Sequence, residues 1–402
     1  MKNNKKSQIY FYKGKINCLE KIKEEENNKY IQNEFLKVID TQNLSFLFGA
    51  GCSSYKENQD ELGIPTMKDL AKCFYKTLKN DKDEIKNIFE ELNLGNIEEI
   101  KENLEKLMEI LFAHSFISKI HNEPNEVNKL IKFIENFIFD KCNIESEKVK
   151  ELYKKFYRKI LMRDSNLPKV NIFTTNYDLF NESALDELGI IYCNGFSGMI
   201  ERFFNPSIFS YAFAEQMDLN YNKWNIIDNF IYLYKLHGSI SWIEDKDNKH
   251  LFKIKEIQKP CKDNDNSIMI YPTPTKQNSS FGSPYSDIFR EFQKKLMRAN
   301  NILIVIGYSF GDEHINNIIY QALTIPTFRL IVIGDKDVND NTKRLFNLED
   351  NRIWFIYGNN NNKQNIHYFN NFVESILPDS KQDRIEIQLE KVKEFLYKEN
   401  KK

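Results

Sequence analysis

The sequence has little glycine, no closely spaced cysteines and no long apolar runs. Its 402 residues include 14 glycines, where an average composition would give about 28. The six cysteines are widely scattered and no two have C-x-x-C spacing, which excludes a zinc ribbon and a disulfide framework. A run of roughly 18 apolar residues, as a transmembrane helix needs, occurs nowhere, and no apolar segment follows the charged start as it would in a signal peptide. We therefore expect a soluble protein of the cytoplasm with reduced thiols.

An excess of charge of one sign is also absent. The 57 Lys and Arg residues are balanced by 58 Asp and Glu residues, for a formal net charge of −1. Without a global positive field there is no general means of holding phosphates by counterion release, so nucleic acid is not an expected partner. What the chain does have is 41% hydrophobic residues, enough to bury a sizeable core, in a length that predicts two or three structural units.

Short apolar runs mark the expected strands. The run at residues 44–48 ends in a Gly-Ala-Gly turn, and a helix is expected to start at Thr66. Further runs follow Pro168 and alternate with helical patterns; they cover residues 170–173, 231–236, 268–270, 302–306, 328–333 and 353–356. Strands this apolar suit a sheet that is covered on both faces. The pattern predicts an α/β fold with a doubly wound, mostly parallel, Rossmann-like sheet.

A block without strand signals interrupts this pattern. Between residues 80 and 163, Gly95 and Pro124 are the single glycine and the single proline, and apolar residues recur at helical spacing. We expect an inserted helical subdomain at residues 80–163, between the two parts of the sheet domain. The full set of expected units is a helical lead-in at 1–43, the sheet domain at 44–79 and 164–378, the insertion at 80–163 and a charged amphipathic helix at 379–402.

Four segments that follow expected strands are candidates for a ligand site, because open parallel sheets bind ligands beyond the carboxyl ends of their strands. They are Gly49-Ala50-Gly51-Cys52-Ser53, Thr174-Thr175-Asn176-Tyr177-Asp178, Lys235-Leu236-His237-Gly238-Ser239 and Gly307-Tyr308-Ser309-Phe310-Gly311-Asp312. Half of the 14 glycines fall in or near this expected crevice: Gly49, Gly51, Gly63, Gly238, Gly307, Gly311 and Gly334.

The first three segments each have a functional and a structural interpretation. Small residues at Gly49 and Gly51 allow backbone N–H groups to approach a phosphate, although a tight turn needs glycine as well. Asn176 and Asp178 can hold an amide and a ribose hydroxyl, or can form a turn and a helix cap. His237 can act as a general base near neutral pH, or can be a structural histidine.

The fourth segment also fits the pattern G-x-S-x-G. Asp335 and His367 follow it in the chain order of an α/β-hydrolase, which would make Ser309 a nucleophile. A metal site in this segment is the other hypothesis, but consecutive residues at a helix start do not point at one centre, so no metal is expected. The residues of that unfavoured site would be Asp312, Glu313 and His314.

Taken together, these segments and Gly63-Ile64-Pro65 occur in the order found in bacterial sirtuin-like proteins. The sequence resembles the divergent sirtuin-like (silent-information-regulator-like) NAD-hydrolase family of anti-phage defence systems. The matching segments lie between about residues 48 and 335, whereas the lead-in, the helical block and the tail have no matching motif. The resemblance implies a Rossmann-type domain that takes NAD⁺ as its substrate.

The resemblance also assigns roles to individual residues. It implies that Asn176 and His237 are catalytic, with Asn176 and Asp178 holding the nicotinamide ribose and the attacking water and with His237 as the base. The pyrophosphate of NAD⁺ would lie on Gly49, Ala50, Gly51 and Ser53. The remaining cofactor-binding positions would be Pro65 on the nicotinamide side, Gly307, Ser309 and Asp312 on the adenosine side, and Gly334 and Asp335 near the adenine.

Two departures from protein-deacylating sirtuins bear on the activity. Such enzymes carry a four-cysteine zinc ribbon, which this chain cannot build, and they have Asp-Phe-Arg where this chain has Thr66-Met67-Lys68. Both departures favour water over acetyl-lysine as the acceptor. The resemblance therefore implies hydrolysis of NAD⁺ to nicotinamide and ADP-ribose, which depletes cellular NAD in abortive infection. Protein deacylation, a Ser309 esterase and a non-catalytic sensor of NAD⁺ or ADP-ribose stay open as alternatives.

The resemblance implies control as well, since unregulated NAD⁺ hydrolysis kills the cell that carries the enzyme. A homo-oligomer is expected, with a HerA-type ATPase or an Argonaute-like protein as a candidate partner. Neither a membrane nor directly bound nucleic acid is expected.

Overall fold

The structure is a computed structural model of the 402-residue chain. It describes residues 8–57, 60–80, 83–121, 126–164, 166–216, 224–245, 251–260, 267–269, 283–359 and 365–378. The amphipathic helix expected at 379–402 lies outside the described residues.

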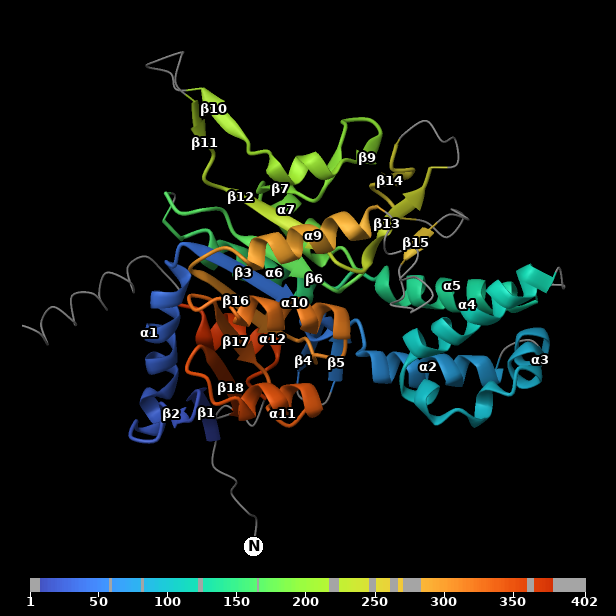
Figure 1. The fold of residues 1–402 in the computed structure, drawn as a ribbon, viewed down its shortest axis with the longest axis horizontal. Helices are drawn as coiled ribbons and strands as arrows, with labels where there is room; N and C mark the ends of the chain where they lie inside the picture. Colours follow the sequence, from blue (N-terminus) through green and yellow to red (C-terminus); the bar gives the residue numbers. More distant parts are fainter. Residues whose placement is uncertain are drawn as a thin grey trace, which may run out of the picture.

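A nine-stranded sheet forms the centre of the fold, in the order β2-β1-β18-β17-β16-β3-β6-β12-β7 (Figure 1). From β18 to β7 all neighbouring strands are parallel. These strands are β3 (Asn43–Phe48), β6 (Asn171–Thr174), β7 (Ile191–Cys193), β12 (Phe230–Lys235), β16 (Asn301–Ile306), β17 (Arg329–Ile333) and β18 (Ile353–Asn359). The chain runs from β3 outward to one edge and returns through β16 on the other side of β3. The predicted doubly wound α/β fold is confirmed, and its switch point lies between β3 and β16.

Helices cover both faces of this sheet, which explains why its strands are apolar throughout. In β16, Ile302, Ile304 and Ile306 face one hydrophobic core, while Leu303 and Val305 face the other. The first core is covered by α1 (Asn27–Ile39), α6 (Glu147–Ile160), α7 (Phe180–Glu187) and the C-terminal turns α12 (Phe369–Asn371) and η7 (Phe372–Ile376). The second is covered by α9 (Tyr285–Leu296), α10 (Glu313–Leu323) and α11 (Asp340–Asn347).

The N-terminal segment is only partly helical, so the predicted helical lead-in is wrong in its first half. Strand β1 (Gln8–Lys13) pairs antiparallel with β18, and β2 (Ile16–Asn17) pairs with β1. The reason is the aromatic content of β1, since Phe11 is fully buried and Tyr10 stacks on Tyr357 of β18 with ring centroids 5.1 Å apart. Helix α1 follows, after the short turn η1 (Glu24–Glu26).

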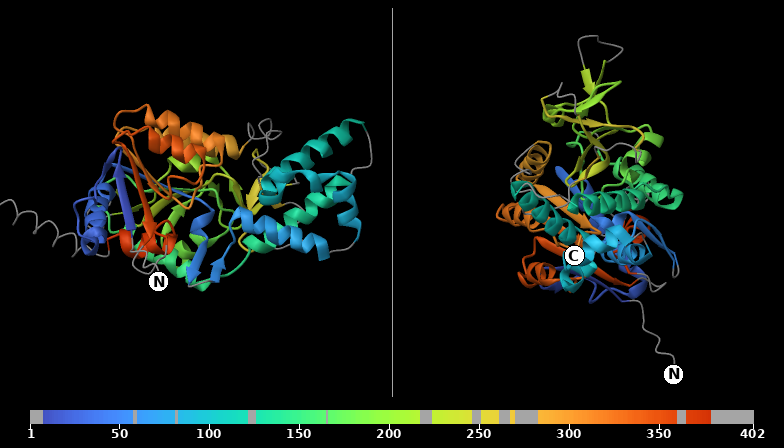
Figure 2. Two further views of the ribbon diagram at one scale, coloured as in Figure 1. Left: turned by 90° about the horizontal axis from the view of Figure 1, so that it is seen from below. Right: turned by 90° about the vertical axis from the view of Figure 1, so that its right-hand side faces the viewer.

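The helical insertion projects to one side of the sheet domain (Figures 1 and 2). It consists of α2 (Met67–Asn80), α3 (Asp83–Glu91), η3 (Leu94–Asn96), η4 (Glu98–Glu102), α4 (Leu104–His121) and α5 (Val127–Cys142). Its helices therefore start before the expected boundary at residue 80. Helix α6 fell inside the predicted block, but it packs on the sheet, with the Phe156 ring 5.1 Å from Phe46 and 5.2 Å from Phe48.

A second, antiparallel sheet was not expected. Its order is β15-β13-β14-β9-β8. Residues 268–270 were predicted as part of the parallel series, yet β15 (Ser267–Met269) pairs antiparallel with β13, which corrects that assignment. The other strands are β8 (Phe196–Ser197), β9 (Arg202–Phe204), β13 (Gly238–Glu244) and β14 (Ile254–Glu256). Small additions are the hairpins β4 (Ser54–Glu57) with β5 (Asp60–Gly63) and β10 (Ala214–Gln216) with β11 (Trp224–Ile226), and the turns η2 (Ala50–Cys52) and η5 (Pro206–Ser210).

None of the helices in the described residues combines the length and the apolar character that crossing a membrane requires.

Candidate active site at the switch point of the sheet

Two glycine-containing loops meet where β3 and β16 end. The N–H of Gly49 donates to the Ile306 carbonyl at 2.9 Å, and the N–H of Gly51 donates to the Gly307 carbonyl at 3.0 Å. A Cβ atom on Gly49 would lie 2.3 Å from the Gly307 oxygen, and one on Gly307, whose φ is +66°, would lie 2.7 Å from the Cys52 nitrogen. The glycines of both loops are therefore required by the contact between the loops themselves.

Asn176 joins the loop after β6 to the loop after β3. Its amide nitrogen Nδ2 donates to the Gly49 carbonyl at 3.0 Å and to Ser53 Oγ at 2.7 Å. Ser53 Oγ in turn donates to Asp178 Oδ2 at 2.5 Å. The side chains of Asn176, Asp178 and Ser53 are all buried. Because an amide group has two hydrogens and both are used within the protein, its oxygen Oδ1 is the atom that can accept a hydrogen bond from a ligand.

Asp178 also has the structural role that the sequence allowed. Its Oδ1 accepts a hydrogen bond from the Phe180 N–H at 3.0 Å, at the start of α7. One carboxylate oxygen thus holds the helix start and the other holds Ser53, so the functional and the structural interpretations of this residue are compatible.

His237 follows β12 and pairs with Asp312, which precedes α10. The distance from His237 Nε2 to Asp312 Oδ2 is 3.1 Å. The other carboxylate oxygen of Asp312 caps α10, accepting hydrogen bonds from the N–H groups of His314 at 2.8 Å and Ile315 at 3.1 Å. The resemblance assigned Asp312 to the adenosine side of NAD⁺, whereas the structure places its carboxylate against the histidine.

The charge of Asp312 controls the protonation of His237. Burial alone opposes the charged imidazolium, but the hydrogen bond to Asp312 and its negative charge raise the pKa of His237 above the usual value. The same contact outweighs the burial of Asp312 and lowers the pKa of its carboxyl group. With an Nε2–H directed at Asp312, Nδ1 is the ring atom that can take a proton; we infer this tautomer from the hydrogen bond.

A carboxylate of the helical insertion acts on this site through its charge. Glu105 lies in the first turn of α4, which is capped by Asn103, whose Oδ1 accepts from the Glu105 N–H at 2.9 Å. The Glu105 carboxylate interacts electrostatically with both His237 and Asp312. Its pKa is raised, chiefly by burial and further by the charge of Asp312, while His237 opposes the shift. Sequence reasoning missed this residue, because Asn-Leu-Glu at a helix start carries no functional signal.

A known family model matches the later part of the chain. Residues 170–356 match the family model described as the SIR2-like domain. This part of the chain is therefore similar to the SIR2-like domain. The matched range holds Asn176, Asp178, His237 and Asp312, whereas the glycine turn at residues 49–53 precedes it. Such a domain supports an NAD-dependent enzyme activity.

Among solved structures, one that the chain resembles is described as the crystal structure of a Sir2 homolog–NAD complex. The identity is 14%, the TM-score is 0.38, and the alignment covers 79% of this chain and 91% of the other. No curated protein matches the chain significantly.

Three asparagines hold the loop at residues 307–312 through its backbone carbonyls. Phe310 has φ +57° in this loop. Its carbonyl accepts hydrogen bonds from Asn316 Nδ2 at 2.8 Å and Asn341 Nδ2 at 3.0 Å, and Asn339 Nδ2 donates to the Ser309 carbonyl. In a nucleophile elbow the serine itself occupies the strained position. Here that position is Phe310, so the geometry does not favour the esterase hypothesis for Ser309.

The other predicted binding residues lie outside the group formed by Asn176, Asp178, His237 and Asp312. Gly334 and Asp335 follow β17, one strand further from β3 than β16 is, and Asp335 Oδ1 accepts from the Asp337 N–H at 3.1 Å. Pro65 lies between β5 and α2. Among the described residues, Ala50 has the one N–H in the turn at residues 49–53 that does not donate within the protein.

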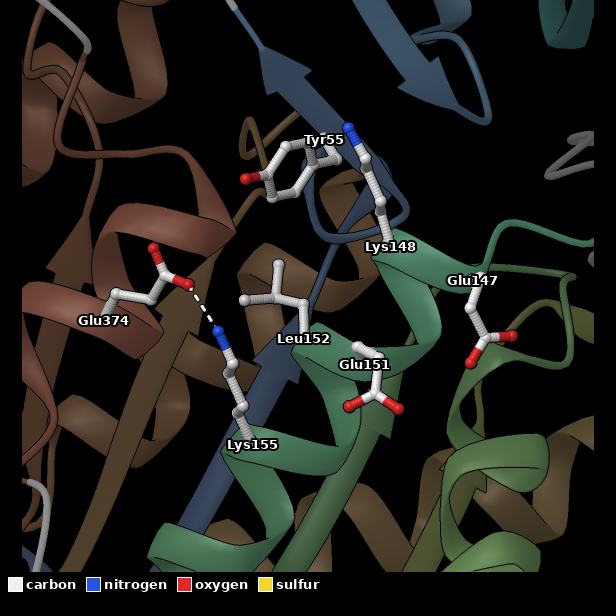
Figure 3. Close-up of a pocket in the computed structure, with 7 residues that line it drawn as sticks. All are labelled: Tyr55, Glu147, Lys148, Glu151, Leu152, Lys155 and Glu374. Atoms are coloured by element: carbon white, nitrogen blue, oxygen red, sulfur yellow. Dashed lines mark hydrogen bonds and ion pairs between the residues drawn. The ribbon is translucent and has the colours of Figure 1, made fainter.

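A separate cavity of about 240 Å³ lies between β4, α6 and η7 (Figure 3). Within it Lys155 Nζ donates to Glu374 Oε1 at 2.8 Å. None of the predicted site residues lines it. Its lining consists of Tyr55, Glu147, Lys148, Glu151, Leu152, Lys155 and Glu374.

A cluster of acidic residues beside this cavity has lysine partners. In the described part of the chain, ligand atoms of Glu147, Glu151 and Glu187 lie within 4.8 Å of one another. Lys150 pairs with Glu147 at 2.8 Å and with Glu187 at 2.6 Å, and Lys154 pairs with Glu151 and Glu187. The lysines account for the close approach of these carboxylates.

Proposed function

We propose that this protein hydrolyses NAD⁺ to nicotinamide and ADP-ribose at the site formed by Asn176, Asp178, His237 and Asp312. One observation carries the proposal: in a SIR2-like domain, a buried amide with its oxygen left for a ligand lies beside a buried histidine–carboxylate pair. The ring centroids of Tyr177 and His237 are 6.5 Å apart, so the Asn176 turn and the histidine are neighbours.

The chemistry requires few groups. Nicotinamide leaves as a neutral molecule from a cationic glycosidic bond, so the enzyme has mainly to position water and to stabilise an oxocarbenium-like ribose. Asn176 Oδ1 can accept a hydrogen bond from water or from a ribose hydroxyl. His237 Nδ1 can take the proton of the attacking water, and Asp312 then stabilises the imidazolium that forms.

The glycine turn has a narrower role in this proposal than the sequence implied. The N–H groups of Gly49, Gly51, Cys52 and Ser53 all donate within the protein. The N–H of Ala50, an exposed residue, is therefore the donor of this turn that we assign to the pyrophosphate. Pro65, Gly307, Ser309, Gly334 and Asp335 keep the binding roles that the resemblance implies for them, whereas Asp312 acts on His237.

Incubation of the purified protein with NAD⁺, followed by chromatography of nicotinamide and ADP-ribose, tests this function. We expect the two products in equal amounts without any added peptide. Asn176→Ala and His237→Ala should each lower kcat by about 10²- to 10⁴-fold. Release of nicotinamide only in the presence of an acyl-lysine peptide would instead identify a deacylase, and binding of NAD⁺ without turnover would identify a sensor.

We further propose that the activity serves anti-phage abortive infection in the cytoplasm, where it depletes NAD without a zinc ion. The family resemblance supports this role, and the danger of free NAD⁺ hydrolysis supports its control by homo-oligomerisation or by a HerA-type ATPase or Argonaute-like partner. Light scattering coupled to the NAD⁺ assay tests control by assembly, and phage infection of cells carrying wild type or His237→Ala tests the role. Equal phage yield from both strains would count against it.

A further inference from the structure

A buried lysine, Lys235, contacts the backbone of the turn that carries Asn176. Lys235 is the last residue of β12 and its side chain is 1% exposed. Its ammonium group lies 3.2 Å from the Tyr177 carbonyl and 3.0 Å from Glu182 Oε1, and it also donates to the Asp178 carbonyl. The two peptide carbonyls accept hydrogen bonds from the ammonium group, whereas Glu182 contributes an ion pair.

These contacts hold the backbone of the turn, whereas Ser53 binds the side chains of Asn176 and Asp178. The Tyr177 carbonyl also accepts from the Ile240 N–H at 3.1 Å, on the strand that follows His237. Lys235 stands two residues before His237 on the same strand end. Any shift of the Lys235 contacts therefore changes the position of the Asn176 turn relative to the histidine.

The burial of the Lys235–Glu182 ion pair favours a role in positioning the turn over a role in stability alone. Glu182, in the first turn of α7, is 8% exposed, so both charges are removed from water. Replacing a buried ion pair by apolar residues of similar volume is often neutral for stability or favourable. What apolar residues cannot do is fix two peptide carbonyls at hydrogen-bonding distance.

We propose that Lys235, neutralised by Glu182, is a positioning residue that fixes the turn carrying Asn176 and Asp178 relative to His237. The expected effect of Lys235 on NAD⁺ turnover rests on the proposed function. Its effect on the geometry of the turn does not.

The test uses the double variant Lys235→Met/Glu182→Met, which leaves no unpaired buried charge. We expect kcat for NAD⁺ to fall about 10²-fold while KM changes by less than about threefold, because only the alignment at the reacting centre is lost. The melting temperature should stay close to that of wild type or rise. The matched control is Lys13→Met/Glu34→Met, which removes a 2.6 Å ion pair between β1 and α1 and should leave kcat unchanged.

Hydrogen exchange measured by mass spectrometry reports the stability of the Asn176 turn and does not depend on enzyme activity. In the double variant, amides of residues 175–180 should exchange about tenfold faster than in wild type, with the control pair unaffected. Wild-type kcat and wild-type exchange in a folded double variant would overturn the positioning role. Failure of the wild-type protein to hydrolyse NAD⁺, combined with faster exchange in the variant, would overturn the proposed function alone.

Discussion

Asp312→Asn isolates the effect of the carboxylate on His237. Asparagine is a good N-cap, so its Oδ1 can still accept the N–H groups that start α10 and the helix should form. At the Oδ2 position, 3.1 Å from His237 Nε2, the variant presents an NH₂ donor in place of an acceptor. The imidazole must then accept at Nε2 and carry its proton on Nδ1, the atom that the proposed mechanism uses as the base.

The magnitude follows from this change of tautomer. In the serine-protease triad, the equivalent exchange of an orienting aspartate for asparagine costs about 10⁴-fold in kcat with the geometry intact. For Asp312→Asn we expect a loss of about 10³- to 10⁴-fold in kcat, measured by nicotinamide release at saturating NAD⁺. A variant within about threefold of wild type would refute the catalytic pairing of Asp312 with His237.

The pH dependence gives the same variant a second readout. A general base must be neutral, so the activity of the wild type rises with pH through the raised pKa of His237. Loss of the carboxylate leaves burial to act on the imidazole, lowers its pKa and moves the rise to lower pH. An unmoved rise would show that another group titrates.

The free energy of unfolding should also depend on the charges of His237 and Asp312. Because the folded-state pKa of His237 is raised, its contribution is complete below the unfolded value of about 6.5 and is lost as pH rises through the folded value. The lowered pKa of Asp312 gives a contribution that is present above about 3.9 and is lost as pH falls through the folded value. Urea denaturation near pH 5.5 should show wild type about 1.5–3 kcal/mol more stable than Asp312→Asn, with a smaller difference well above the His237 pKa.

Two further predictions concern the insertion and the loop contact. Glu105→Gln should lower the pKa of His237 and shift the activity profile to lower pH, by less than Asp312→Asn does, because the carboxylate acts on His237 through its charge; an unchanged profile would exclude it from the site. Gly49→Ala should lower the free energy of unfolding by about 1–3 kcal/mol, because the new Cβ would lie 2.3 Å from the Gly307 oxygen. Gly334→Ala, with its nearest neighbour at 3.7 Å, is the control, and equal stability of the two variants would contradict the loop contact.

The central sheet could be predicted from the sequence because its strands are buried on both faces. Runs such as residues 302–306 have no polar position, and that pattern has few solutions other than a covered parallel strand. Strand β1 could not be predicted in this way, since it lies next to the two-residue edge strand β2 and beside a charged start. The predicted pairing of β15 was wrong for a different reason: a three-residue apolar run does not specify its partner strand.

The candidate site was predictable in its residues more than in its contacts. Asn176, Asp178 and His237 became candidates because they follow strands of one sheet. The pairing of His237 with Asp312 joins residues 75 positions apart and depends on the relative placement of β12 and α10. Glu105 lies in the insertion, and periodicity gives no information on which end of a helix approaches a sheet. The sequence predicted a ligand contact for Gly49 and Gly51, whereas the structure shows their contact with the loop at Gly307.

Hydrolysis of NAD⁺ in H₂¹⁸O tests the central claim most directly. If water is the acceptor, mass spectrometry of the product will show one ¹⁸O atom in ADP-ribose, formed with an equal amount of nicotinamide in the absence of peptide, and His237→Ala will abolish both products. Intact NAD⁺, or nicotinamide that forms only with an acyl-lysine peptide, would contradict the account.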